Sequence, residues 1–81
     1  MRLPRDLSGE DLARSLRQYG YEITRQTGSH IRLTTRIRGT ENHITIPAHN
    51  PLKLGTLSAI LAEVAAYLEM DRAALVNKLF S

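Results

Sequence analysis

Three histidines and a run of arginines are the residues of this 81-residue sequence best suited to chemistry on a phosphate group. Imidazole changes its charge near neutral pH, so a histidine can take up or release a proton during a reaction. Arginine stays charged, and its planar guanidinium matches the oxygens of a phosphate. Four arginines and no acidic residue lie between Ile23 and Thr40, and His30 lies among them. This pattern suggests a site for a polyanion such as RNA.

Alternation with a period of two predicts that this histidine and three of the arginines share one face of a β-strand. The residues expected to face the core are Ile31, Leu33, Thr35 and Ile37, and those expected on the opposite face are His30, Arg32, Thr34, Arg36 and Arg38. A row of three arginines with a histidine at one end can grip a phosphate backbone. A solvated sheet face, on which arginine prevents aggregation, is the simpler interpretation and the one that the pattern alone favours.

The register of the next hairpin bears on a two-histidine site. If the turn pairs Arg38 with His43, Arg32 lies opposite His49, and His30 and His49 share one end of the hairpin. Two histidines near a phosphate-binding face suit acid–base cleavage of RNA, in which one group takes the 2′-hydroxyl proton and another protonates the leaving oxygen. A slip of one residue would remove this arrangement.

Each histidine also has a structural interpretation. His43, beside the turn, is expected to be a surface residue, His49 can order a polar loop, and His30 can be ordinary strand sequence. The three are separated by thirteen and six residues, spacings that match no compact ligand motif, and the chain has no cysteine. We therefore expect neither a metal site nor a cofactor.

The elements that must position these residues begin with a helix over residues 9–19. Ser8 is a good N-cap, with Asp11 placed three residues later as in a capping box. Gly20 is placed to end the helix in a left-handed conformation. The apolar positions Leu12, Leu16 and Tyr19 fall on one helical face.

Three strands and two helices are expected to follow. Tyr21 and Ile23 alternate with polar neighbours, the second strand runs through the arginines, and a turn at residues 38–42 leads to a third strand that Pro47 ends. Thr56 can cap a helix whose buried stripe is Leu57, Ile60, Leu61, Val64 and Leu68, and Asp71 can cap a short C-terminal helix. This order predicts an α+β sandwich with helices on one face of a three-stranded antiparallel sheet.

Length and composition indicate a single domain over residues 1–81 with a thin core, so chemistry should occur on a face or in a shallow groove. The absence of cysteine suits a reducing compartment. No apolar run approaches the ~20 residues of a membrane span, so we expect no membrane partner and a cytoplasmic location. The net charge of +3 is a weak hint of an anionic partner, but all of the excess lies in residues 1–41.

Several short motifs resemble the HicA, or YcfA-like, family of toxins from type II toxin–antitoxin systems. They are Leu16…Tyr19-Gly20-Tyr21, Gly28-Ser29-His30 entering a strand, Ile44-Thr45-Ile46-Pro47-Ala48-His49, Lys53-Leu54-Gly55-Thr56-Leu57 and Ile60-Leu61. Each motif is weak alone, but their order within 81 residues is fairly specific. The resemblance covers roughly residues 7–79.

The resemblance implies a fold like that of double-stranded-RNA-binding domains and activity as a ribosome-independent mRNA interferase that needs no metal. The family's catalytic histidine corresponds to His30, and Ser29 precedes it in the same motif. It also implies a HicB-like antitoxin partner that binds the toxin and blocks its active site. A second catalytic group is not implied, and His49 is our own candidate.

One departure concerns the basic surface. Ala48 stands where similar sequences often carry a bulkier basic residue, and around the loop and second helix only Lys53 remains. RNA contact is therefore expected from Arg32, Arg36 and Arg38, from Ser29 and Lys53, and from the first helix.

Three functions remain open from the sequence. The leading hypothesis is a HicA-like endoribonuclease, with His30 as general acid or base. The alternatives are a non-catalytic RNA-binding module of the same fold and a pure interaction protein that binds an acidic partner through the same basic face.

Overall fold

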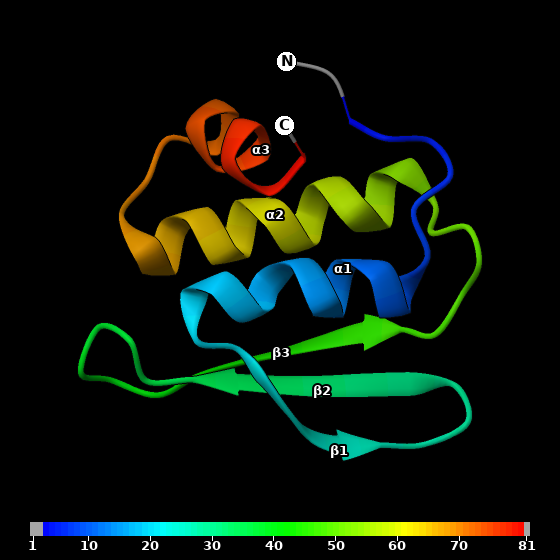
Figure 1. Ribbon diagram of the computed structural model, residues 1–81, viewed down its shortest axis with the longest axis horizontal. Coiled ribbons are helices and arrows are strands. Elements are labelled where there is room, and N and C mark those ends of the chain that lie inside the picture. The colour runs from blue at the N-terminus through cyan, green and yellow to red at the C-terminus, as the bar shows by residue number, and fades with distance from the viewer. Residues whose placement is uncertain (1–2, 81) are drawn as a thin grey trace.

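The computed structural model describes residues 3–80, in which three helices lie on one side of a three-stranded antiparallel sheet. The chain runs in the order helix, three strands, two helices (Figure 1). The elements are α1 (Gly9–Ser15) with a 3₁₀ turn (Leu16–Tyr19), β1 (Glu22–Gln26), β2 (His30–Thr35), β3 (Asn42–Pro47), α2 (Leu54–Leu68) and α3 (Arg72–Phe80). The α+β class, the strand number and the short C-terminal helix are as the sequence predicted.

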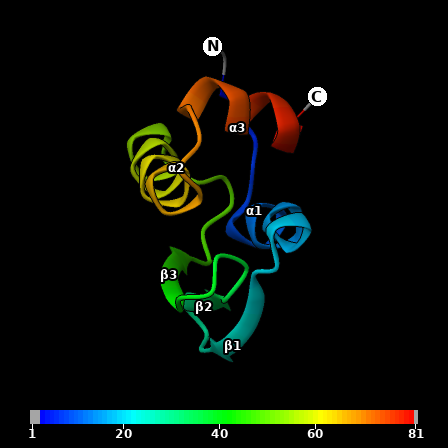
Figure 2. The ribbon, with the colours of Figure 1, turned by 90° about the vertical axis from the view of Figure 1, so that its left-hand side faces the viewer.

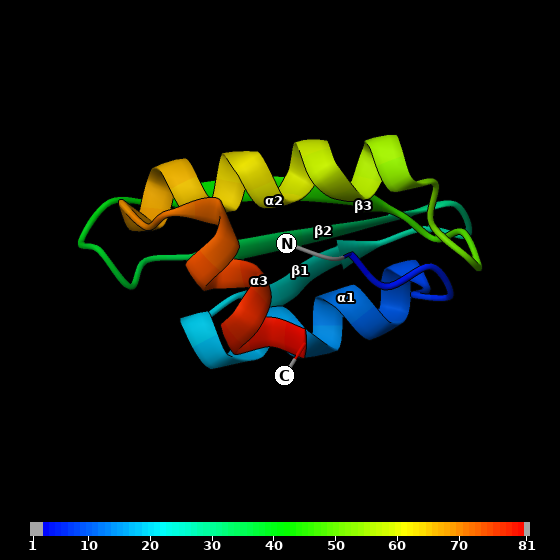
Figure 3. The same ribbon diagram turned by 90° about the horizontal axis from the view of Figure 1, so that it is seen from above.

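The elements form three layers (Figure 2). α1 and α2 lie side by side on one face of the sheet, and α3 lies across them on the side away from the strands (Figure 3). The strand order is β1-β2-β3, so β2 is central and β1 and β3 are edges. The buried core comes from the inner faces of β2 and β3 and from the helices, and it includes Leu12, Leu16, Ile31, Leu33, Ile46, Leu57, Leu61 and Leu75. The other face of the sheet is left open.

Local rules explain both ends of the first helical segment. Ser8 Oγ accepts a hydrogen bond from the Asp11 amide at 3.0 Å, and Asp11 Oδ2 accepts one from the Ser8 amide at 3.4 Å, which confirms the predicted capping box. Gly20 has φ of 78°, the left-handed conformation predicted for it. Gly9 has a different reason to be glycine, because a Cβ there would lie 2.1 Å from the Pro47 carbonyl oxygen. The start of α1 therefore sits directly against the end of β3.

The predicted length and register of the β2–β3 hairpin are wrong. β2 ends at Thr35 rather than continuing through the arginines, and Arg32 pairs with Thr45, not with His49. The buried Thr35 hydroxyl donates to the Tyr19 carbonyl at 2.8 Å and accepts the Ile37 amide at 3.2 Å, which turns the chain out of the strand. Ile37 is consequently 54% exposed instead of facing the core. The predicted and observed registers differ by an even number of residues, so the prediction of which β2 side chains face the core and which face the open side remains correct.

Ile23 in the first strand is 53% exposed, because β1 is an edge strand whose pairing with β2 is irregular between Ile23 and Arg25. One other local prediction needs correction. Thr56 does not cap the second helix, which begins at Leu54 with Lys53 at the N-cap and no side-chain capping bond. The predicted cap of the last helix is confirmed, since the Ala74 amide donates to Asp71 Oδ2 at 3.4 Å.

Candidate functional site

His30 is held by the turn that joins β1 to β2. The Thr27 amide donates to the His30 carbonyl at 2.9 Å, and the His30 amide donates to Thr27 Oγ1 at 3.1 Å. His30 and Arg32 are two residues apart on β2, are both exposed, and alternate with the buried Ile31, so both belong to the open face. Sequence periodicity therefore placed these two side chains on the correct face.

Ser29 makes a direct contact with the imidazole of His30. Its Oγ lies 3.1 Å from His30 Nδ1, a hydrogen-bonding distance in which either group can donate according to the tautomer. Within residues 3–80, Nε2 of this ring has no hydrogen-bond partner. The arrangement orients the ring through one nitrogen and leaves the other available to a ligand on the open face.

The segment that carries His49 lies at the same end of the sheet. His30 pairs with Pro47, the last residue of β3, and the Ala48 amide donates to the Ser29 carbonyl at 2.9 Å. The start of β2, the end of β3 and the first turns of α1 and α2 all gather at the right-hand end of Figure 1. The proximity predicted for the two backbone segments is thus present, although the register proposed for it is not.

His49 lines a depression that is separate from the hollow on the open face. The depression measures about 250 Å³, lies at the start of α1, and is also lined by Ser8, Glu10, Asp11, Arg14, Ala48 and Asn50. His30 is not among these residues, and the carbonyl of His49 accepts a hydrogen bond from the Gly9 amide at 2.9 Å. A role for His49 as second catalytic group remains a prediction.

The predicted row of three arginines does not form along β2. Arg36 and Arg38 lie in the loop between β2 and β3, at the opposite end of the sheet from the start of β2 (Figure 1). Arg36 forms an ion pair with Glu41, and Arg38 forms one with Glu69. Both guanidiniums are therefore already matched to carboxylates, and Arg32 is the one member of the predicted row that lies on the strand.

A shallow hollow of about 620 Å³ occupies the open face of the sheet. Its lining residues are Gly20, Glu22, Thr24, Arg25, Arg32, Thr34, Thr35, Arg36, Glu41 and His43. Arg25 and Arg32 are Cα partners across β1 and β2, so both guanidiniums project from the same part of the hollow. Arg25 could not be singled out from the sequence, because the irregular pairing that brings it opposite Arg32 leaves no mark in the local alternation.

His43 is exposed, as predicted, but it takes part in a polar network on the open face. Its Nδ1 lies 2.8 Å from Thr34 Oγ1, and its Nε2 lies 2.7 Å from Glu41 Oε1. Thr34 Oγ1 also lies 3.0 Å from Thr24 Oγ1, so the network crosses all three strands. Arg36 holds the pKa of Glu41 below its ordinary value by hydrogen bonding and charge, with a smaller contribution from His43.

The remaining predicted contacts, Ser29 and Lys53, lie at the end of the sheet where β2 begins. Lys53 is exposed and precedes the first turn of α2, which starts at that end (Figure 1). Its positive charge therefore lies at the same end of the sheet as His30. Direct contact of either residue with RNA remains a prediction.

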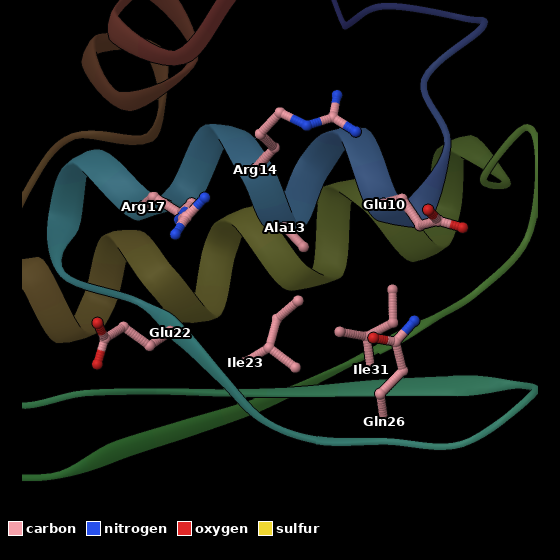
Figure 4. Close-up of a pocket in the computed structure, with 8 residues that line it drawn as sticks. All are labelled: Glu10, Ala13, Arg14, Arg17, Glu22, Ile23, Gln26 and Ile31. Carbon is pink, nitrogen blue, oxygen red and sulfur yellow. The ribbon is translucent and has the colours of Figure 1, made fainter.

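A second groove lies on the helix side of the edge strand, between α1 and β1 (Figure 4). It measures about 500 Å³ and is lined by Glu10, Ala13, Arg14, Arg17, Glu22, Ile23, Gln26 and Ile31. Its charged groups are of both signs, and it contains no histidine. The proposed catalytic histidine thus lies outside this groove.

Two absences within residues 3–80 bear on the site. No cluster of three or more histidine, cysteine, aspartate or glutamate side chains in that range is arranged to hold a metal ion. No helix within the same residues is both long and apolar enough to cross a bilayer.

Comparison with known proteins places the chain in a family. Residues 9–65 match the family model described as HicA toxin of bacterial toxin–antitoxin systems, and this match includes His30, Arg25, Arg32 and His49. No curated protein and no solved structure matched the chain. Because the family model covers well over half of its length, the chain belongs to the HicA toxin family.

Proposed function

We propose that the protein is an endoribonuclease that cleaves mRNA, with His30 as the general acid or base. HicA toxins are generally RNA-cleaving, and family membership is the first support. The observation that carries the proposal for this chain is the setting of His30. It stands at the start of β2 on the open face, with Nδ1 bound to Ser29 Oγ at 3.1 Å and Arg32 two residues away on the same face.

This geometry supports the following reaction. The imidazole of His30 takes the proton of a ribose 2′-hydroxyl, whose oxygen attacks the adjacent phosphorus, or it protonates the departing 5′-oxygen. The bond from phosphorus to that 5′-oxygen breaks. The products are a cyclic phosphate and a 5′-hydroxyl, and no water or metal ion is consumed. His49 is our candidate for a helper to His30, because the Ala48 amide beside it donates to the Ser29 carbonyl.

The direct test is incubation of purified protein with mRNA in EDTA. We expect cleavage in EDTA and a loss of at least about 100-fold in rate for His30→Ala, the usual worth of one acid–base group. His49→Ala should lower the rate by less. Full activity of His30→Ala would overturn the assignment, and cleavage lost on chelation would overturn the metal-free route. Cleavage abolished by His43→Ala but retained by His30→Ala would move the role to His43.

A non-catalytic RNA-binding module is the second candidate. It is favoured by one observation, that the hollow lined by Arg25 and Arg32 is also lined by His43 and not by His30. Salt-dependent RNA binding without any product would support this candidate over the first.

Toxin–antitoxin membership implies an antitoxin partner. We propose that this partner is HicB-like and covers the open face around His30, so that RNA and antitoxin compete. Adding the purified antitoxin to the cleavage reaction should inhibit it in proportion to the complex formed. Cleavage that continues in a saturated complex would contradict this arrangement.

A further inference from the structure

A β-bulge aligns two like charges on the open face. At the start of the β1–β2 ladder Glu22 pairs with Thr34 and Ile23 with Leu33, but beyond Thr24 the register shifts by one residue and Arg25 pairs with Arg32. With the first register continued, Arg25 would face Ile31 and its side chain would lie on the other side of the sheet. The bulge therefore turns Arg25 toward Arg32. Bulges are common beside functional sites, where they re-aim a side chain.

No acidic side chain within residues 3–80 neutralises the positive charges of Arg25 and Arg32. Within residues 3–80, neither Arg25 nor Arg32 forms an ion pair or a side-chain hydrogen bond, whereas Arg36 and Arg38 each have a carboxylate partner. Like charges directly opposite on neighbouring strands destabilise a sheet. An anion bound between the two guanidiniums removes that repulsion, and a phosphate is the anion whose oxygens best fit their planar forks.

The two carboxylates that line the hollow do not neutralise the guanidiniums of Arg25 and Arg32. Glu41 is occupied by Arg36 and His43. Glu22 lines the hollow at the position opposite Thr34, and it makes no ion pair with Arg25 or Arg32. The space between the two guanidiniums is thus open to a ligand from solution.

The pair is close to the proposed catalytic group. Arg32 is two residues from His30 on the same strand and face, a separation of about 6–7 Å along the strand. A single RNA strand lying along β2 can therefore place one phosphate at His30 and the next between the guanidiniums.

We infer that Arg25 and Arg32 form a phosphate clamp for the RNA phosphate next to the one attacked at His30. The clamp deepens the proposed function and rests on it for the identity of the ligand. An acidic protein segment is the competing occupant, and RNA is favoured because Arg32 lies on the same strand and face as His30, where the proposed reaction places an RNA phosphate. The clamp positions the strand and takes no part in proton transfer.

The test measures binding separately from cleavage. An RNA oligonucleotide with 2′-O-methyl groups, which has no free 2′-hydroxyl, is titrated with the wild type, Arg25→Ala, Arg32→Ala and the double variant at several salt concentrations. Lys78→Ala is the control, because it removes one positive charge from α3, which lies on the side of α1 and α2 away from the sheet. We expect each clamp variant to weaken RNA binding roughly tenfold. Each should also reduce the slope of the logarithm of the binding constant against the logarithm of the salt concentration by about 0.7, and the double variant should reduce this slope by twice as much. Lys78→Ala should change neither quantity by a comparable amount.

Further measurements separate the outcomes. Arg25→Lys keeps the charge but loses the planar fork, so it should recover part of the binding. Thermal unfolding without RNA should show that Arg25→Ala melts no lower than the wild type, since a like-charge contact is removed. Unchanged binding and slope in both alanine variants would overturn the clamp even if the wild type cleaves RNA. Weakened binding in a protein that never cleaves would keep the clamp and overturn the proposed catalysis. Loss of antitoxin binding with RNA binding intact would assign the pair to a protein partner instead.

Discussion

His30 and Pro47 lie directly opposite each other at the end of the β2–β3 ladder. Proline has no amide hydrogen to donate, so it is a natural last residue for β3. The next amide, that of Ala48, donates instead to the Ser29 carbonyl at 2.9 Å. The chain thereby leaves the sheet beside the first residue of β2, and the imidazole of His30 stands at an open corner where a long polymer can pass.

Ser29 is expected to act as a positioning residue for His30. Removing its hydroxyl in Ser29→Ala frees the ring to rotate about the contact now held at 3.1 Å. The rate constant kcat should fall about tenfold, the worth of one hydrogen bond, while KM changes little. Steady-state cleavage of a short RNA measures both. Ser29→Thr retains the hydroxyl and should recover most of the rate, and a change confined to KM would contradict a positioning role.

Gly20 should be far less tolerant of substitution than Gly55. Gly20→Ala places a Cβ at a φ of 78° and 2.9 Å from Thr35 Oγ1, which disturbs the bond from that hydroxyl to Tyr19. We expect a loss of about 1–3 kcal/mol in the free energy of unfolding, measured in urea. Gly55, in the first turn of α2, has open space around it, and Gly55→Ala should stabilise the protein by up to about 1 kcal/mol. Equal effects at the two positions would contradict this account.

Ser8 should link the stability of α1 to pH. Its side-chain and backbone hydrogen bonds, with help from Arg14, hold the pKa of Asp11 below its ordinary value. The stabilisation is therefore present above the ordinary pKa of the carboxyl group and is lost as the pH falls through the lowered value. Ser8→Ala should cost about 1 kcal/mol at neutral pH. It should also flatten the acid side of a stability profile measured by urea unfolding, and an unchanged acid profile would contradict the link.

Tyr21 should make the protein sensitive to alkali. Burial, with smaller effects from Tyr67 and Glu63, raises the pKa of Tyr21 to about 12 from 10.0. The unfolded chain then loses this proton before the folded one does, so stability is retained below pH 10.0 and declines as the pH rises toward 12. Unfolding in urea at rising pH should show this decline.

Tyr21→Phe provides the matched comparison. It removes the hydroxyl that donates to Asn42 Oδ1 at 2.6 Å, so it should be less stable than the wild type near neutral pH. The difference between the two proteins should then narrow above pH 10.0. A constant difference across the whole alkaline range would show that another group causes the decline.

The parts of the fold that local chemistry decides were predictable from the sequence. The Ser8–Asp11 capping box and the left-handed Gly20 depend on residues within a few positions of each other. The alternation of Ile31 and Leu33 with His30 and Arg32 likewise reports a strand with one buried face.

The parts of the fold that depend on contacts between distant residues were not predictable from the sequence. The end of β2 is set by the bond from Thr35 to Tyr19, and the following loop is held by Tyr67, whose hydroxyl donates to the Thr40 carbonyl at 2.5 Å and accepts the Arg38 amide at 3.1 Å. These contacts remove Arg36 and Arg38 from the strand. The position of Arg25 similarly depends on a bulge that only the pairing of two strands reveals.

Two backbone hydrogen bonds between the start of α1 and the segment after β3 have a consequence for how the chain folds. The Gly9 amide bonds to the His49 carbonyl at 2.9 Å, and the Leu52 amide bonds to the Leu7 carbonyl at 2.8 Å. The contacts join residues that are 40 and 45 positions apart in the chain, so each closes a long loop when it forms. During synthesis, the first helix emerges well before the residues that fasten its start. A growing chain that stops before His49 therefore lacks the closure that fixes this end of the sheet.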